Sequence, residues 1–323
     1  MIISYASPRH FLAALAVLAC SVPAGAQQPT WRFAAPDAAS AWFQTLDNAH
    51  LSGPGAFAFY RSPGAPDSPL ARALAASSQY EVLHFAPLYF PSATRQGLVR
   101  AIRDAAAASA TATAPRAAFL VGALTSTLPT TALRAPLAEL AATVERSQPP
   151  VIPAAALTRW QHAWNTRFAT PLAPFLRAER LDGGIAMVAV ALGPEGRLFA
   201  GQPANRSDNI AAVGTFGAPA DADAPVFAFV RELCFPLVSR AADRAPSLKA
   251  PRAEAARRTS VAAVRCGAEL LDLLNPAEAR GYRAQWQHVA DPTGRLAFDT
   301  LFPPDPLLAP RIRTALSSIA PRP

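Results

Sequence analysis

Arg231 and Glu232 are the only charged residues in the apolar segment from 224 to 238. A segment that is apolar on nearly every side is typical of a helix buried in a protein core. A charge buried there without a partner costs several kcal/mol, so both side chains need compensating groups. Adjacent residues on a helix point about 100° apart, and we therefore expect each of the two to find its partner on another element.

The elements around this pair resemble the zincin metallopeptidases, most closely the gluzincin-type domains of secreted bacterial proteins of poorly defined function. The resemblance covers residues 181–274, where a strand pair leads into an apolar helix with the motif RELCF. In an active zincin, histidines at i and i+4 bind zinc and a glutamate at i+1 is the general base. Glu232 keeps the base position, whereas Arg231 and Phe235 stand at the ligand positions. The third ligand position falls near Val261 on the next helix.

The residues at these three positions cannot bind a metal. Arginine is a permanent cation, phenylalanine and valine have no lone pair to donate, and a zinc site needs about three protein ligands. The resemblance therefore implies no metal and no cofactor, with Glu232 as a vestigial general base. We expect the guanidinium of Arg231 to supply the positive charge that zinc would otherwise place near Glu232. A core helix with a purely structural ion pair is the alternative interpretation.

The helix predicted for residues 252–274 is expected to provide partners for Glu232. Helical spacing separates a charged side of this helix from an apolar face. The charged side is formed by Glu254, Arg258, Val261, Arg265 and Glu269. We predict that Glu232 accepts hydrogen bonds from Arg265 or Arg258, with Arg231 as the alternative donor should the helix be distorted at Pro236.

Two cysteines, Cys234 and Cys266, follow the N-terminal segment. In an oxidising compartment they can pair, but helical geometry places Cys266 about 140° around its helix from Val261. Cys234 instead flanks Arg231, so the disulfide stays an open alternative. A nucleophile pair of Cys234 with His84 is a further alternative, for which residue type is the only argument. The other interpretation of His84 is a satisfied core histidine on an apolar strand.

Segments with strand and helix character alternate with Gly- and Pro-rich stretches, as is typical of an α+β fold. We predict a mainly helical protein with a small mixed or antiparallel sheet and a zincin-like core in the C-terminal half. Expected strands are a first one from Trp31, one at 80–88, a hairpin of 184–192 with 197–200, and one at 209–216. The predicted domains are a helix-rich N-terminal lobe, 27–180, and a zincin-like C-terminal lobe, 181–323, or one compact domain, 27–323.

The first 26 residues have the three parts of a secretory signal peptide. Arg9 supplies the positive charge, residues 11–19 form an apolar stretch too short to cross a bilayer, and residues 24–26 form a small-x-small cleavage site. We expect a mature N-terminus at Gln27 and a location in the periplasm or outside the cell. A lipoprotein anchored through Cys20 is the alternative, and no other stretch is long and apolar enough to span a membrane.

The net charge of +8 comes almost entirely from arginine, because Lys249 is the only lysine. The arginines are scattered among acidic residues without a basic run, which argues against a nucleic-acid partner. We predict a secreted, non-catalytic binding or accessory protein, a pseudo-peptidase whose partner is an envelope protein or peptide. A hydrolase with relocated catalytic residues is the alternative, and a purely structural role is a third hypothesis.

Overall fold

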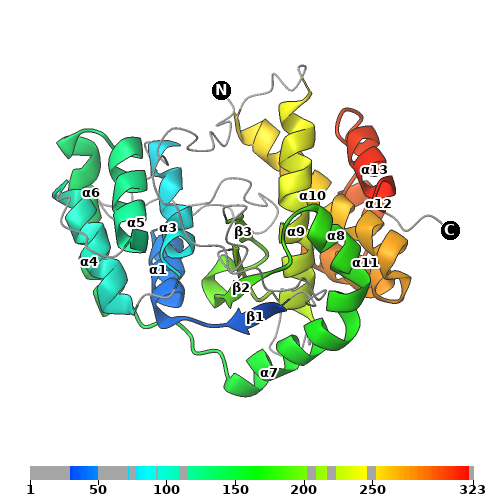
Figure 1. The fold of residues 1–323 in the computed structure, drawn as a ribbon, viewed down its shortest axis with the longest axis horizontal. Coiled ribbons are helices and arrows are strands. Elements are labelled where there is room, and N and C mark those ends of the chain that lie inside the picture. Colours follow the sequence, from blue (N-terminus) through cyan, green and yellow to red (C-terminus); the bar gives the residue numbers. More distant parts are fainter. Residues whose placement is uncertain are drawn as a thin grey trace, which may run out of the picture.

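Four short strands form the centre of the fold (Figure 1). They are β1 (Thr30–Ala34), β2 (Gly183–Val188), β3 (Gly196–Phe199) and β4 (Ile210–Val213), in the order β1-β2-β4-β3. β1, β2 and β4 are parallel, and β3 lies antiparallel to β4 at the edge of the sheet. The computed structural model describes residues 30–49, 72, 78–91, 94–108, 115–201, 209–216, 223–245 and 252–319. It confirms a mainly helical α+β fold with a small mixed sheet.

Both faces of the sheet are covered by helices, which is why its inner strands are almost wholly apolar. Successive residues of a strand point to opposite faces. Ala186 and Val188 therefore belong to one hydrophobic cluster, with the helices that follow residue 150. Met187 and Ile210 belong to the other cluster, with helices from the first half of the chain. The two helical groups lie on opposite sides of the sheet in Figure 1.

The predicted hairpin at 184–200 is wrong, because β4 lies between its two strands. β2 runs into a short 3₁₀ turn, η3 (Val190–Leu192), and the chain reverses at Gly193, where φ is +54°. β4 then fills the space that this detour opens. The amide of Ala189 donates to the carbonyl of Val213 at 2.9 Å, and the amide of Gly214 donates to that of Glu195 at 3.2 Å.

The first helical group covers one face of the sheet. It comprises α1 (Asp37–Asn48), the 3₁₀ helix η1 (Ser78–Phe85), α3 (Ala86–Tyr89), α4 (Arg95–Ala106), α5 (Pro115–Thr127) and α6 (Thr131–Arg146). The strand predicted at 80–88 is wrong, since η1 and α3 occupy these residues. Tyr80 and Leu83 are three residues apart and both buried, as 3₁₀ spacing places them, and Pro87 has no N–H for a sheet.

The second helical group covers the other face and holds the candidate site. It comprises α7 (Ala154–Ala163), the π-helical turn η2 (Trp164–Phe168), α8 (Ala169–Ala178), α9 (Ala224–Asp243), α10 (Arg252–Leu274), α11 (Pro276–Ala290), α12 (Phe298–Leu301) and α13 (Ala309–Ser317). Trp160, Trp164 and Phe168 are core residues, as their spacing predicts. The bounds of α10 agree with the prediction from sequence.

The lobe boundary predicted at residue 181 falls between α8 and β2. β1 comes from the N-terminal side of this boundary but pairs with β2, so residues from both predicted lobes build one sheet. Among the helices described, none combines the length and the apolar character that crossing a membrane requires. The predicted signal peptide, with Cys20 and Gln27, lies outside the described residues.

Candidate functional site

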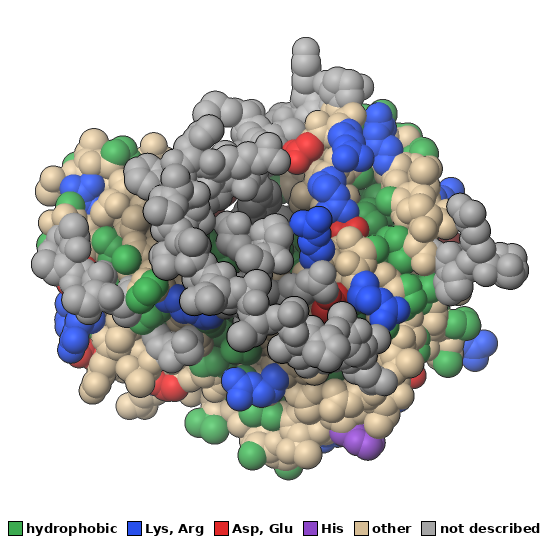
Figure 2. Space-filling view, in the orientation of Figure 1, with side chains coloured by type: hydrophobic (Ala, Val, Ile, Leu, Met, Phe, Trp, Pro, Cys, Tyr) green, Lys and Arg blue, Asp and Glu red, His purple; other side chains and the backbone are tan. Residues whose placement is uncertain are grey.

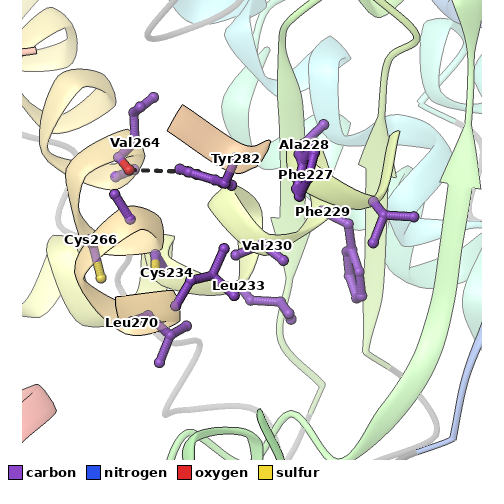
Figure 3. Close-up of a cluster of buried hydrophobic side chains, with 14 of the residues drawn as sticks. Phe227, Ala228, Phe229, Val230, Leu233, Cys234, Val264, Cys266, Leu270 and Tyr282 are labelled. Atoms are coloured by element: carbon purple, nitrogen blue, oxygen red, sulfur yellow. Dashed lines mark hydrogen bonds between the residues drawn. The ribbon is translucent and has the colours of Figure 1, made fainter. Parts of the chain in front are cut away.

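Helix α9 is buried along most of its length, as its apolar sequence predicts. It packs against the sheet on one side and against α10 on the other. The ring of Phe229 fixes it to the sheet side, with its centroid 4.7 Å from that of Trp31 and 4.9 Å from that of Trp164. Figure 3 shows the α9 side chains inserted between strands and helices in this cluster.

Arg231 and Glu232 lie in this core, and each side chain is only 2% exposed. Nη1 of Arg231 donates a hydrogen bond to Oε1 of Glu232. The expectation that neighbouring residues on a helix cannot satisfy each other is therefore wrong. An arginine side chain is long enough to bend back across the angle between the two positions, and its guanidinium still has donors for other partners.

The remaining groups around Arg231 come from three helices. Its Nη2 donates to Oγ of Ser260 on α10 at 2.6 Å. Its guanidinium carbon lies 4.8 Å from the ring centroid of Phe235, one turn further along α9, and 5.6 Å from that of Trp286 on α11. Cation–π contacts are strongest where water is excluded, as it is here. Phe235, at a predicted ligand position, thus packs against the cation.

Glu232 lies under the edge strand β3. A Cβ atom at Gly196 would come within 2.5 Å of both Cγ and Oε1 of Glu232, so only glycine allows this approach. The neighbouring Arg197 is buried, and it donates to the carbonyl of Gly196 at 2.5 Å and to Oε2 of Glu195 at 2.7 Å. Glu195, Arg197, Glu232, Arg231 and Ser260 thus form a polar layer between β3 and α10.

Burial raises the pKa of Glu232 above its ordinary value. The positive charges of Arg231 and Arg197 act in the opposite direction and the charge of Glu195 reinforces the rise, but desolvation is the largest effect. A raised pKa is a common property of a general base. Here, however, the side chain is only 2% exposed, it accepts a hydrogen bond from Arg231, and Gly196 lies directly against it.

The predicted partners of Glu232 bind other groups. Nε of Arg258 donates to Oδ2 of Asp305 at 2.7 Å, and Nη1 of Arg265 donates to Oδ1 of Asp299 at 2.7 Å. The charged side of α10 therefore faces the C-terminal segment, and its Ser260 side faces α9. The donor to Glu232 is Arg231, the predicted alternative, although α9 continues through Pro236 as one helix.

Metal binding has no suitable donor set at this site. Val261 is buried beside Ser260, and neither it, Arg231 nor Phe235 offers a lone pair. Across the described residues, no group of three or more His, Cys, Asp or Glu side chains is placed to hold a metal ion. What the site provides is a desolvated carboxylate clamped by an arginine.

Sequence reasoning missed four residues of this site: Gly196, Arg197, Ser260 and Trp286. Gly196 stands in a recognisable turn, but nothing in its surroundings marks it as the point where Glu232 approaches. Ser260 is a single small polar residue at the boundary of the charged side of α10, and the larger arginines beside it give the stronger sequence signal. Trp286 looks like any other core aromatic residue until a cation is found over its ring.

The proposed pair of Cys234 and His84 is not brought together. Cys234 belongs to the cluster around α9 and α10, whereas His84 is buried in η1, between core residues of the opposite cluster. Comparison with known proteins identifies no relative: no protein-family model, curated protein or solved structure matches this chain. Function has to be inferred from the side chains and surfaces of the described residues.

Proposed function

We propose that this chain is an exported, non-catalytic binding protein of the cell envelope, on a zincin-like scaffold without a metal site. The observation that carries the proposal is the burial of Glu232. It occupies the position of a general base, yet it is 2% exposed, bonded to Arg231 and covered by Gly196. A carboxylate enclosed in this way keeps the buried Arg231 paired and has no route to a substrate.

The arrangement of elements supports the zincin-like part of the proposal. An edge strand, β3, lies over the helix that carries Glu232, and the following helix, α10, contributes Ser260 from the position next to Val261. Arg231 places a positive charge beside Glu232, where zinc would place one in an active enzyme. The guanidinium thus substitutes electrostatically for a metal and replaces catalysis with structural support.

Export is the second part of the proposal, and it depends on the segment from residue 1 to 26. A cleaved protein begins at Gln27, and a lipoprotein begins at an acylated Cys20. Mass spectrometry of the N-terminal peptide from an envelope fraction distinguishes these outcomes. An uncleaved chain in the cytoplasm contradicts export altogether.

A surface with several exposed arginines, here called the arginine face, indicates which kind of partner the protein binds. We define it as Arg177, Arg180, Arg240, Arg244 and Arg311, all exposed, at the ends of α8 and α9 and on α13. The helices meet here: Nη2 of Arg240 binds both oxygens of Glu179, and Nη2 of Arg311 donates to the carbonyl of Arg244 at 3.3 Å. Figure 2 shows basic side chains in a column over this region. An acidic protein or peptide is the complementary partner.

The absence of catalysis is tested with the purified chain, a labelled unfolded protein as substrate, and added zinc. We expect no cleavage above the blank. Zinc-dependent cleavage that Glu232→Gln abolishes contradicts the proposal and identifies an active peptidase. Cleavage that survives Glu232→Gln supports the alternative, a hydrolase with relocated catalytic residues.

The binding surface is tested with a fluorescent polyglutamate peptide at low salt, where exposed charges are least screened. We expect Arg177→Glu with Arg244→Glu to weaken binding by roughly tenfold. The matched control reverses two exposed arginines on the first helical group, Arg100 and Arg146. An equal loss in both double variants means that net charge alone attracts the peptide, and the arginine face then has no special role.

A further inference from the structure

Two cysteine side chains meet where α9 packs against α10. Cys234 and Cys266 are both fully buried and both are free thiols. The Cys266 thiol lies close enough to Cys234 to raise the pKa of its thiol. Figure 3 shows the two sulfur atoms at the interface of the helices, among apolar side chains such as Leu233 and Leu270. The side of α10 that faces α9 differs from the predicted one, because Ser260 and not the charged side of the helix faces Arg231.

A catalytic role does not fit this pair. Burial raises the pKa of the Cys234 thiol well above its ordinary value, and the neighbouring Cys266 thiol raises it further. A nucleophilic cysteine needs the opposite, a lowered pKa and access to solvent. Two buried thiols on helices that pack against each other are instead placed where a cross-link between the helices can form.

We propose that Cys234 and Cys266 are a modification site, an intramolecular disulfide that locks α9 to α10. The co-reactant is an external disulfide, either a small molecule or an oxidised protein dithiol. One cysteine thiolate attacks it, forms a mixed disulfide and releases one thiol. The second thiolate then attacks the mixed disulfide, forms the Cys234–Cys266 bond and releases the second thiol. The protein loses two electrons, and the two thiol protons end on the released thiols.

Burial determines when this bond forms. Neither thiol is exposed in the folded chain, so exchange with an external disulfide takes place while α9 and α10 are still apart, during folding. The bond then lies one turn from Arg231 on α9 and under two turns from Ser260 on α10. It therefore holds together the same two helices that the Arg231–Ser260 hydrogen bond joins. This inference concerns the fold and is independent of the proposed binding function.

The test counts thiols in the full-length chain. The chain is unfolded with reductant, refolded in a buffer of reduced and oxidised glutathione, and alkylated in denaturant. We expect one alkylated cysteine, Cys20, and a peptide pair containing Cys234 and Cys266 that is lighter by two hydrogen atoms. Alkylation of both Cys234 and Cys266, or a separate glutathione on each, overturns the proposal.

A melting experiment gives a second readout on the folded protein. A bond that closes the chain between these residues should raise the melting temperature of the oxidised protein by about 10 °C over that of the reduced protein. Cys20→Ser should keep this difference, and Cys234→Ala with Cys266→Ala should abolish it. Equal melting temperatures for oxidised and reduced wild-type protein contradict the cross-link. The thiol count decides the question even where the double variant fails to fold.

Discussion

The two sides of helix α10 carry arginine–carboxylate contacts in very different environments. On its inner side, Ser260 accepts a hydrogen bond from Arg231, which is paired with Glu232 on α9, and both of these side chains are 2% exposed. On its outer side, Arg258 binds Asp305, with side chains that are 22% and 8% exposed. The chemical groups are the same on both sides. The two carboxylates differ in the number of hydrogen-bond donors that reach them and in how far water can reach the pair.

This difference has opposite effects on the two carboxylates. Glu232 receives one hydrogen bond, from Arg231, and desolvation raises its pKa despite the nearby positive charges. Burial also acts to raise the pKa of Asp305, but hydrogen bonds from Arg258 and from the amides of Leu307 and Leu308 outweigh it and lower the pKa. A buried ion pair is therefore stable in its charged form only where enough donors replace the lost water.

The largest expected effect comes from breaking the inner pair. Glu232→Ala leaves the Arg231 guanidinium buried without its carboxylate, and we expect the free energy of unfolding to fall by about 3–5 kcal/mol. Chemical denaturation measures this loss. The double variant Arg231→Met with Glu232→Leu removes both charges and keeps the volume, so it should recover most of the stability. A loss below about 1 kcal/mol in Glu232→Ala means that this carboxylate is not a buried partner.

The second effect tests how closely β3 covers the inner pair. In Gly196→Ala, the new Cβ would lie within 2.5 Å of Cγ and Oε1 of Glu232, so either the strand or the carboxylate has to shift. We expect a loss of about 1–3 kcal/mol. Gly122→Ala is the matched control, because its Cβ meets nothing within 4 Å. A helical glycine replaced by alanine should raise stability by about 0.5–1 kcal/mol. Similar changes in both variants contradict the close approach.

Much of the inner side could be predicted from the sequence. The apolar run around Arg231 and Glu232 predicts a core helix, and two charges within it predict compensation. The spacing of apolar residues in 252–274 predicts α10 with its correct bounds. These features depend on periodicity within one element, which a single sequence contains.

The partners could not be predicted, because they depend on elements that come together from distant parts of the chain. Helical spacing predicts that the charged side of α10 faces Glu232, but Asp299 and Asp305, on the segment around α12, bind Arg265 and Arg258 instead. The approach of Gly196 to Glu232 depends on β3 lying at the sheet edge, and this in turn depends on β4 separating β2 from β3. A turn motif alone predicts a hairpin and misses the inserted strand.

The outer pair should respond more weakly than the inner pair. Arg258→Ala removes the main charged donor of Asp305, but the amides of Leu307 and Leu308 remain and water can enter. We expect a loss of about 1–2 kcal/mol in chemical denaturation. The neighbouring Arg257→Ala is the control, since its pair with Glu254 lies at the surface and should contribute nothing measurable. A loss for Arg258→Ala as large as that for Glu232→Ala would remove the distinction between the two sides.

The smallest effects come from replacing each carboxylate by its amide. The stability difference between wild type and each amide variant should change with pH, with slopes of opposite sign for Glu232 and Asp305. The pKa of Glu232 is raised in the folded protein, so the folded state retains this proton when the unfolded state has lost it. The stability of wild type relative to Glu232→Gln should therefore fall as the pH rises through the ordinary glutamate range towards the raised pKa. The pKa of Asp305 is lowered. The advantage of wild type over Asp305→Asn should thus be present above the ordinary aspartate range and disappear as the pH falls through the lowered pKa.

Unfolding free energies measured between about pH 3 and pH 8 cover both ordinary ranges. The other titratable groups are the same in wild type and in its amide variant. Their contribution to the pH dependence therefore cancels in the difference between the two unfolding free energies. Slopes of opposite sign mean that desolvation dominates at Glu232 and that hydrogen bonding dominates at Asp305. Two slopes of the same sign would mean that water or a further donor reaches Glu232. The carboxylate would then be accessible, and the main support for a non-catalytic Glu232 would be lost.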